Sequence, residues 1–548
     1  MKVQPLLSAS CAIVLAAVSP APAGPASATG PAADAALLKF PYPYRAAVTV
    51  CSDIDSATVE KFQAVHELVN TTHRILRGSP SWLVLFTDPE IVNRESWREG
   101  IDGFGLPIAD SCWLYQDDIG IFERYDEAAG RPVPHDHNGR DFRDIIDDWM
   151  RRGWIDTLHT PGAGHIPREA TAAGLRWLEE KDYRRLTVWV NHSYTVTPSG
   201  IAPGGERALP FLVKNLVRCG TGLLCLLGGE SIARRITESP YPQRFPPGQT
   251  AVCWTLTVLL AGSSLWLLTC LVVRRLRKRR NLIAGLVVLA AASGVSYLIR
   301  MNFAQGDDPD SPYYNADLVR RHGFRFYWLL GSEGQAQSVA NTLVLPEWNY
   351  DGRSSPLRIV RLDDGSRCLA FYRCHKGPGG HQSLELLSEA ALEDLCARQG
   401  TAILYTHWTG RPASVFTAAG LDGLASLKRF YQAGRVWVAP TSDILRVSFM
   451  RTFLDYRVHL EGGKRIIDVI RVSSPVEAAF VPTVADLRGI SFECPADLPV
   501  EIRLAGKAVG NDALDFISAG DRTIVRFRQQ PGSTAPSTSS RASAPGSR

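Results

Sequence analysis

Two long apolar segments near the middle of the chain constrain its architecture more than any other feature. Residues 251–273 and 282–299 carry no charged side chain, and six Lys and Arg residues occupy the connection at 274–280. Each segment matches the roughly 20 helical residues that cross a bilayer, and a basic connection is typical of the cytoplasmic side. We therefore expect a transmembrane helical hairpin over 251–300, with both flanking parts outside the cytoplasm. A buried helical pair within a soluble domain is the alternative, but it would bury six cations.

The N-terminus has the pattern of a targeting segment. Lys2 precedes an apolar stretch over 6–18, and a run rich in Pro, Ala, Gly and Ser follows to Gly30. The stretch is short for a membrane span, and small residues suit cleavage by a signal peptidase. We expect residues 1–30 to be a signal peptide and linker, and the protein to lie in a bacterial inner membrane with extracytoplasmic domains. An uncleaved anchor or a disordered tail are the alternatives.

Charge and cysteine content exclude some functions. The formal net charge is only +5 over 548 residues, and part of it comes from the basic run, which argues against a general nucleic-acid surface. The eleven cysteines include no Cys-x-x-Cys spacing, so a zinc site built from thiolates is not expected. In an exported protein the close pairs Cys219/Cys225 and Cys368/Cys374 are candidate disulfides.

Strand-like and helical segments alternate on both sides of the expected hairpin. The strand-like runs are 46–51, 82–86, 186–191, 324–330 and 402–407, and the helical segments are 59–76, 140–152, 170–181 and 388–399. Such alternation indicates an α/β arrangement with a mostly parallel sheet or barrel, in blocks 38–245 and 302–450. Short alternating runs over 451–528 predict a small β-rich module. The tail 529–548, rich in Pro, Ser and Thr, is expected to be disordered.

Three of the apolar runs end in side chains suited to catalysis. The first ends in Asp53 and Asp55, the second leads into His159 and His165, and the third ends in His407. The carboxyl ends of parallel strands form the edge where α/β active sites lie. A carboxylate with two neutral imidazoles suits Zn²⁺, and a histidine at such an edge suits a general acid. The structural alternatives are a helix N-cap and turn, a surface loop, and a capped core histidine.

The order of these motifs resembles the polysaccharide deacetylases of the NodB-homology type, carbohydrate esterase family 4, in a subtype whose first motif reads Asp-x-Asp. Further stretches similar to the family are 110–113, 189–192, 311–318 and 323–328. The resemblance covers residues 40–200 and 305–445, on either side of the expected hairpin. It implies a deformed (β/α) deacetylase-like barrel that the hairpin interrupts.

The resemblance also implies roles for individual residues. Asp55, His159 and His165 would bind a divalent metal such as Zn²⁺, Asp53 would be the general base, and His407 the general acid. The implied reaction is metal-dependent deacetylation of an envelope polysaccharide or exopolysaccharide at the outer face of the inner membrane. The implied partner is an acetylated polysaccharide. The inserted hairpin, rather than the resemblance, suggests docking against a polysaccharide synthase or exporter.

Three features depart from the family pattern. His159 and His165 are six residues apart where the family has four, and Asn315 stands where a histidine is expected. The arginine that orients the family's base has no counterpart beside Asn191 and His192. Two alternative functions therefore stay open. One is a catalytically inactive glycan-binding or scaffold protein on the same fold. The other is a glycoside hydrolase with two carboxylates, Asp53 among them, which needs no metal.

Overall fold

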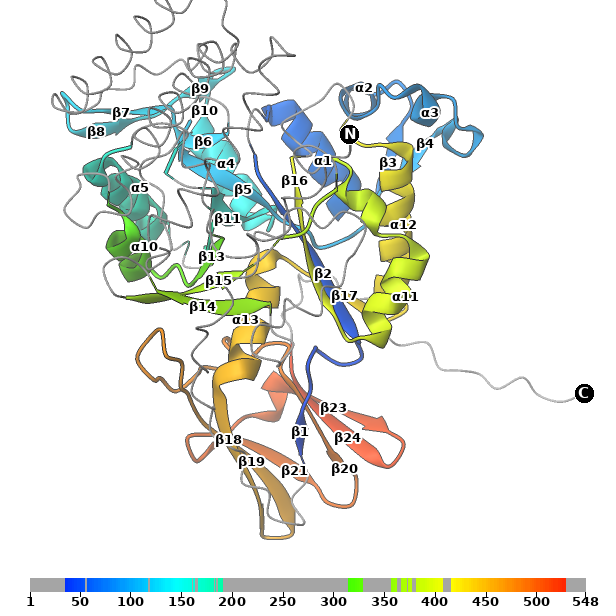
Figure 1. The fold of residues 1–548 in the computed structure, drawn as a ribbon, viewed down its shortest axis with the longest axis vertical. Coiled ribbons are helices and arrows are strands. Elements are labelled where there is room, and N and C mark those ends of the chain that lie inside the picture. Colours follow the sequence, from blue (N-terminus) through cyan, green and yellow to red (C-terminus); the bar gives the residue numbers. More distant parts are fainter. Residues whose placement is uncertain are drawn as a thin grey trace, which may run out of the picture.

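The computed structural model of the chain shows a mixed α/β part above a smaller, C-terminal β part (Figure 1). The structure describes residues 35–54, 57–116, 119–159, 161–162, 166–181, 183, 186–190, 314–328, 356–361, 366–371, 373–376, 381–407 and 415–528.

The largest sheet has seven strands in the order β14-β15-β13-β12-β11-β5-β6. They are β5 (Asp110–Tyr115), β6 (Gly120–Phe122), β11 (Ile155–His159), β12 (Val188–Val190), β13 (Phe326–Trp328), β14 (Leu357–Arg361) and β15 (Arg367–Phe371). All neighbours are parallel except β14 and β15. The strands β5, β11, β12 and β13 are buried along their whole length, as expected of parallel strands covered on both faces.

A second parallel sheet has three strands in the order β16-β2-β17. They are β2 (Ala46–Ser52), β16 (Thr401–Thr406) and β17 (Val436–Val438). Every residue of β2 is buried. Because successive side chains of a strand point to opposite faces, Val48 and Val50 belong to one core cluster, and Ala47 and Cys51 to another. The central strand β2 therefore has an apolar core on each face, and packing on both faces holds its carboxyl end in place.

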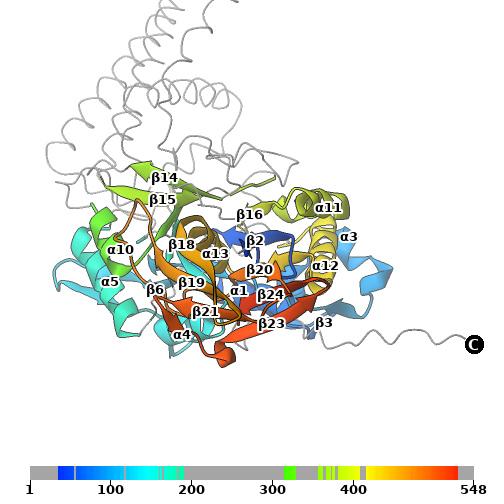
Figure 2. The same ribbon diagram turned by 90° about the horizontal axis from the view of Figure 1, so that it is seen from below.

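Helices pack against both sheets. They are α1 (Val59–Asn70), α2 (Pro80–Leu85), α3 (Pro89–Val92), α4 (Phe142–Arg151), α5 (Arg168–Glu180), α10 (Ala316–His322), α11 (Glu389–Ala397), α12 (Ala418–Gln432) and α13 (Thr441–Phe453). Figures 1 and 2 show α11 and α12 beside the three-stranded sheet, and α5 and α10 beside the seven-stranded one. Side-chain oxygens of Thr58, Ser388 and Thr417 cap the first turns of α1, α11 and α12.

Shorter elements connect these layers. They are β3 (Arg74–Leu76), β4 (Gly100–Asp102), β7 (Arg124–Asp126), β8 (Arg131–Val133), β9 (Asp136–His137), β10 (Arg140–Asp141) and the 3₁₀ helices η1 (Glu95–Trp97) and η6 (Ser383–Leu386). The strand predicted over 82–86 is wrong, because this run lies mostly in α2. Ser79 caps α2, and Pro80 occupies its first turn. These two residues are a helix-start signal that outweighs a short apolar run.

The C-terminal β part contains two four-stranded sheets, β1-β20-β24-β23 and β18-β19-β21-β22. Its elements are β1 (Ala36–Leu37), β18 (Leu454–Glu461), β19 (Lys464–Val472), β20 (Ser491–Pro495), β21 (Val500–Leu504), β22 (Lys507–Ala508), η7 (Asn511–Ala513), β23 (Leu514–Ala519) and β24 (Arg522–Phe527). Strand β1, from the other end of the described chain, pairs with β20. Helix α13 runs directly into β18, so this part is continuous with the α/β part above it (Figure 1).

The predicted deformed (β/α) barrel is wrong, because the parallel strands that the structure describes form two separate sheets rather than one closed sheet. A single bridge between Cys374 and Leu404 and a hydrogen bond of 2.9 Å from Ser111 Oγ to the Ser52 carbonyl link the two sheets. Neither contact continues as a ladder. A barrel needs an unbroken hydrogen-bonded register around its circumference, which these isolated contacts do not supply.

The predicted membrane hairpin is also corrected. Among the residues that the structure describes, no helix is long and apolar enough to cross a bilayer. The longest, α12, has 15 residues, against the roughly 20 that a crossing takes. The hairpin segment 251–300 itself lies outside the described residues, as do the expected signal peptide, 1–30, and the tail. The described residues therefore do not support the hairpin, the transmembrane assignment or the inner-membrane location inferred from them.

Candidate functional site

Five strands bring chemically active side chains to one edge of the α/β part. Asp53 follows β2, His159 ends β11, Trp328 ends β13, and Tyr405 lies at the end of β16. Arg373 lies just beyond β15. Because β13 and β15 are parallel, and β2 and β16 are parallel, their carboxyl ends emerge together. We call Asp53, His159, Arg373 and Tyr405, with His407 next to β16, the Asp53 cluster.

A buried ion pair forms the centre of the Asp53 cluster. Arg373 Nη1 donates to Asp53 Oδ1, and Nη2 donates to Oδ2 at 3.2 Å. Nη1 also donates to the Cys51 carbonyl at 3.1 Å. Arg373 is 0% exposed and Asp53 is 5% exposed. Two parallel, charge-assisted hydrogen bonds fix the carboxylate in both distance and orientation.

Two aromatic rings enclose the guanidinium of Arg373. Its central carbon lies 3.9 Å from the ring centroid of Trp328 and 4.4 Å from that of Tyr405. A flat cation between two ring faces is stabilised by cation–π attraction where water is excluded. A lysine ammonium has neither the planar shape nor the paired donors, so this position requires arginine.

The ion pair sets the protonation states within the cluster. Burial alone would raise the pKa of Asp53, but Arg373 and then His159 outweigh it and hold the pKa below its usual value. Asp53 is therefore an ionised carboxylate at neutral pH. Burial also raises the pKa of the Cys51 thiol to about 12. Cys51 thus stays protonated and is neither a nucleophile nor a thiolate ligand.

His159 is completely buried and points toward Asp53. Its Nδ1 lies 3.2 Å from the Val190 carbonyl, and its Nε2 lies 4.0 Å from Asp53 Oδ2. A carbonyl oxygen can only accept, so Nδ1 carries a proton in this hydrogen bond. Nε2 is then the nitrogen directed at the carboxylate. Packing against the Trp113 ring, with centroids 4.2 Å apart, holds the imidazole in this orientation.

His407 joins the cluster through Tyr405. The Tyr405 hydroxyl lies 3.0 Å from Nδ1 and 3.2 Å from Nε2 of His407. The same phenol ring covers Arg373, so one side chain contacts both the ion pair and the histidine. His407 also contributes to lowering the pKa of Asp53, which places it within electrostatic reach of the carboxylate.

The predicted metal site is only partly covered by the described residues. Asp55 and His165 lie outside them. Among the residues that are described, no three His, Cys, Asp or Glu side chains form a group suited to a metal ion. Both oxygens of Asp53 accept a hydrogen bond from Arg373, and each keeps one further acceptor position. His159 fits a ligand position, because metal-binding histidines usually donate their other ring nitrogen to a carbonyl or carboxylate.

Sequence reasoning found Asp53, His159 and His407 but missed Arg373. The family pattern predicts an arginine beside Asn191 and His192, whereas Arg373 comes from the end of β15. The available signal was an apolar strand ending in a charged residue, the pattern that identified Asp53.

Cys368 and Cys374, a candidate disulfide, are not disulfide-bonded.

The cluster combines an ionised carboxylate in fixed orientation with two imidazoles at an edge of parallel strands. Such a set can accept a proton from water and deliver one to a leaving group, which is the chemistry of hydrolysis. No protein-family model, curated protein or solved structure matches the chain.

Proposed function

We propose that this protein is a hydrolase that removes acetyl groups from a glycan. The observation that carries the proposal is the buried ion pair of Asp53 and Arg373, with His159 and His407 beside it. A buried carboxylate that is kept ionised and oriented by an arginine can accept a proton as a general base. The motif order that resembles polysaccharide deacetylases supplies the substrate class.

Asp53 acts as the general base. It accepts a proton from the water molecule whose oxygen attacks the acetyl carbonyl carbon. Arg373 does not touch the substrate in this scheme and is a positioning residue, because it holds both carboxylate oxygens. Proximity and fixed orientation of this kind supply a large part of the catalysis in enzymes.

His407 acts as the general acid. As the bond between the acetyl carbon and the leaving nitrogen or oxygen breaks, protonated His407 donates a proton to the leaving atom, and acetate is released. Tyr405 contacts both ring nitrogens of His407 and so restrains the imidazole. Asp53 gains one proton and His407 gives one up, so the number of protons on the two side chains together is the same before and after the reaction.

The proposal includes a divalent metal such as Zn²⁺, bound by His159 together with Asp55 and His165. When bound, the ion would polarise the acetyl carbonyl and make its bound water more acidic. The position of His159 Nε2 beside Asp53 favours this assignment, since the base must lie next to the water that it deprotonates.

The test is acetate release from acetylated oligosaccharides, with metal content measured on the same samples. We expect the wild-type protein to bind a stoichiometric divalent metal and to release acetate. Asp53→Asn should lose at least about 100-fold in kcat, as is typical when a general base is removed, and keep its metal. His159→Ala should lose the metal. Asp394→Asn, at an exposed carboxylate of α11, is the matched control and should behave as wild type.

Two other outcomes would overturn the proposal. Oligosaccharide binding without metal or acetate release would favour a non-catalytic glycan-binding protein. Release of reducing sugar that is insensitive to chelators would indicate a glycoside hydrolase.

A further inference from the structure

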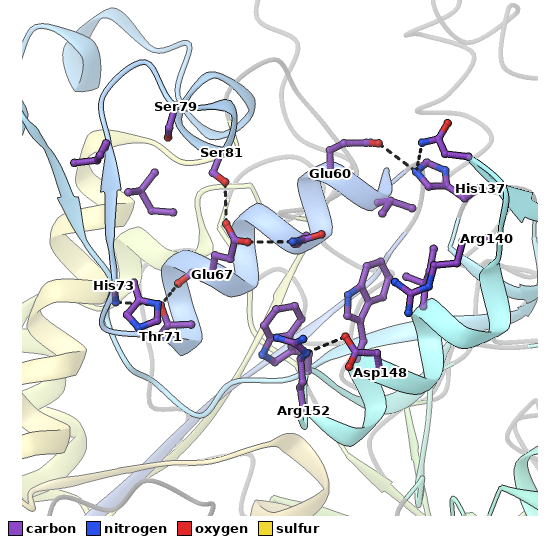
Figure 3. A pocket seen from close by; sticks show the side chains of 18 of the residues that line it. Glu60, Glu67, Thr71, His73, Ser79, Ser81, His137, Arg140, Asp148 and Arg152 are labelled. Atoms are coloured by element: carbon purple, nitrogen blue, oxygen red, sulfur yellow. Dashed lines mark hydrogen bonds and ion pairs between the residues drawn. The ribbon is translucent and has the colours of Figure 1, made fainter.

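A cavity of about 870 Å³ lies along helix α1, and none of its lining residues belongs to the Asp53 cluster. Its volume is within the range of about 300–1,000 Å³ that is usual for ligand pockets. Figure 3 shows α1 crossing the cavity, with residues of β3 and α2 on one side. The β9–β10 turn and α4 form the other side. The α1 helix begins soon after Asp53 in the chain, so the cavity and the Asp53 cluster are built on the same β2–α1 segment.

Charges in the cavity are balanced. The charged lining residues are Glu60, Glu67, Asp148, Arg74, Arg140 and Arg152. Glu60 lies 3.4 Å from His137, and Asp148 lies 2.9 Å from Arg152. Three carboxylates and three guanidiniums leave no excess of either sign. The cavity therefore has no electrostatic preference for an anion or a cation, and a neutral ligand fits it better.

Hydrogen-bonding groups line the cavity around Glu67. This half-buried carboxylate accepts from Ser81 Oγ at 2.8 Å and from Gln63 Nε2 at 3.1 Å. Each carboxylate oxygen has two acceptor positions, so Glu67 can accept further hydrogen bonds. Ser79 and Thr71 add hydroxyl groups. Sugar hydroxyls both donate and accept, which matches a lining of carboxylate, amide and hydroxyl groups.

We propose that this cavity binds a neutral, acetylated oligosaccharide segment, at a distance from the acetyl group that is removed. The choice of an acetylated polymer rests on the proposed function. A peptide is the less suitable occupant. Extended peptides are usually bound through strand edges or apolar pockets. Apolar side chains such as Ile75 and Trp149 do line part of this cavity, but helix α1 contributes the polar groups of Gln63 and Glu67 along it.

The test is calorimetric titration of the full chain with soluble oligomers of N-acetylglucosamine, which are neutral and acetylated. Glu67→Arg removes the central acceptor and fills the cavity with a long cation. We expect it to weaken binding at least about tenfold, since a hydrogen bond to a charged group is lost. Glu67→Gln keeps the size and should weaken binding less. The matched control is Glu180→Arg, the same change at an exposed end of α5, which should bind as wild type.

Equal oligomer affinity in wild type, Glu67→Arg and Glu67→Gln would overturn this inference. So would binding of an uncharged, extended peptide at a Glu67-dependent site without any oligomer binding. The two proposals fail in different ways. Glu67-dependent oligomer binding in a protein that releases no acetate supports the cavity and contradicts the deacetylase. Acetate release with an oligomer KM that Glu67→Arg does not change supports the deacetylase and contradicts the cavity.

Discussion

At the scale of single residues, the main feature is a charge placed where water is nearly excluded. The Asp53 carboxylate is 5% exposed, and Arg373 is not exposed at all. Burying two charges costs several kcal/mol each, and their attraction offsets this only when geometry and hydrogen bonding are good. The paired hydrogen bonds and the flanking rings of Trp328 and Tyr405 supply those conditions.

We expect Arg373→Met to destabilise the protein by about 3–5 kcal/mol, because it leaves the Asp53 charge buried without a partner. The double variant Asp53→Asn/Arg373→Met should recover a large part of this loss, since no charge then remains. Urea unfolding at neutral pH measures both values. Arg398→Met, which breaks an exposed pair with Asp394, is the control and should cost less than about 1 kcal/mol. Strictly additive effects in the double variant would contradict the buried-pair account.

Tyr405→Phe should separate the two roles of the phenol. The ring over Arg373 remains, so stability should change little, whereas the hydroxyl beside His407 is lost. In an active deacetylase we expect kcat to fall by up to about tenfold with KM unchanged, the size of one net hydrogen bond. Tyr405→Leu should lose stability as well, because the cation–π contact is removed. If Tyr405→Phe leaves kcat unchanged and does not move the alkaline limb of the pH profile of kcat, Tyr405 does not position His407.

At the scale of elements, helix α13 depends on a carboxylate from a strand. The N-cap of α13, Pro440, offers no side-chain hydrogen bond. Instead Asp156 of β11 accepts from the Ser442 backbone N–H at 2.8 Å, and Thr157 donates to its other oxygen at 2.9 Å. The start of α13 is thereby attached to the strand that carries His159.

Burial raises the pKa of Asp156 from 3.8 to about 6. A folded-state pKa above the unfolded one means that the native state binds the proton more tightly. The contribution of Asp156 to wild-type stability should therefore fall as pH rises from about 4 to about 6, by at most roughly 3 kcal/mol, and stay lower above that range. Asp156→Asn should lack this decrease. Its free energy of unfolding should therefore increase relative to that of wild type as pH rises through the same window.

Urea unfolding of wild type and Asp156→Asn at several pH values between 4 and 7 tests this expectation, with Asp394→Asn as the control for losing a surface charge. A stability difference that does not change with pH would show that folding does not raise the pKa of Asp156.

At the scale of the whole molecule, the β part and the α/β part share one apolar core. A single cluster joins Ala47 of β2, Phe326 of β13 and Phe449 of α13 to Phe492 of β20. Strand β1 adds a direct pairing between the start of the described chain and the β part. Contacts of this kind make the two parts one cooperative unit.

Phe492→Ala tests that cooperativity, because all 13 tryptophans precede residue 454 and none lies within the β-part segment 454–528. Phe492 is fully buried, and its loss should cost about 3–5 kcal/mol. We expect the denaturation midpoint measured by tryptophan fluorescence to fall, although the substitution lies in the β part. Phe516→Ala, at a 44% exposed position of β23, should leave the midpoint nearly unchanged. An unaltered fluorescence transition in Phe492→Ala would mean that the β part unfolds separately.

The sequence by itself determined which segments are strands with functional ends. The apolar run before Asp53, the run before His159 and the run before His407 are β2, β11 and β16, because local patterning and the alternation of side chains depend on neighbouring residues alone. The strand predicted over 82–86 was wrong because the capping Ser79 and Pro80 just before this run are local signals for a helix.

Only the tertiary structure decided what Asp53 contacts and how the strands are arranged. Arg373 reaches Asp53 because β16 lies between the residues that follow β15 and strand β2. Cys374 bridges to Leu404 of β16, and β16 pairs with β2, although Arg373 and Asp53 are more than 300 residues apart in sequence. The choice between a closed barrel and two sheets likewise depends on pairing around the whole structure. Such pairings are set by packing between distant segments, and no local pattern of residues encodes the partner of a buried charge.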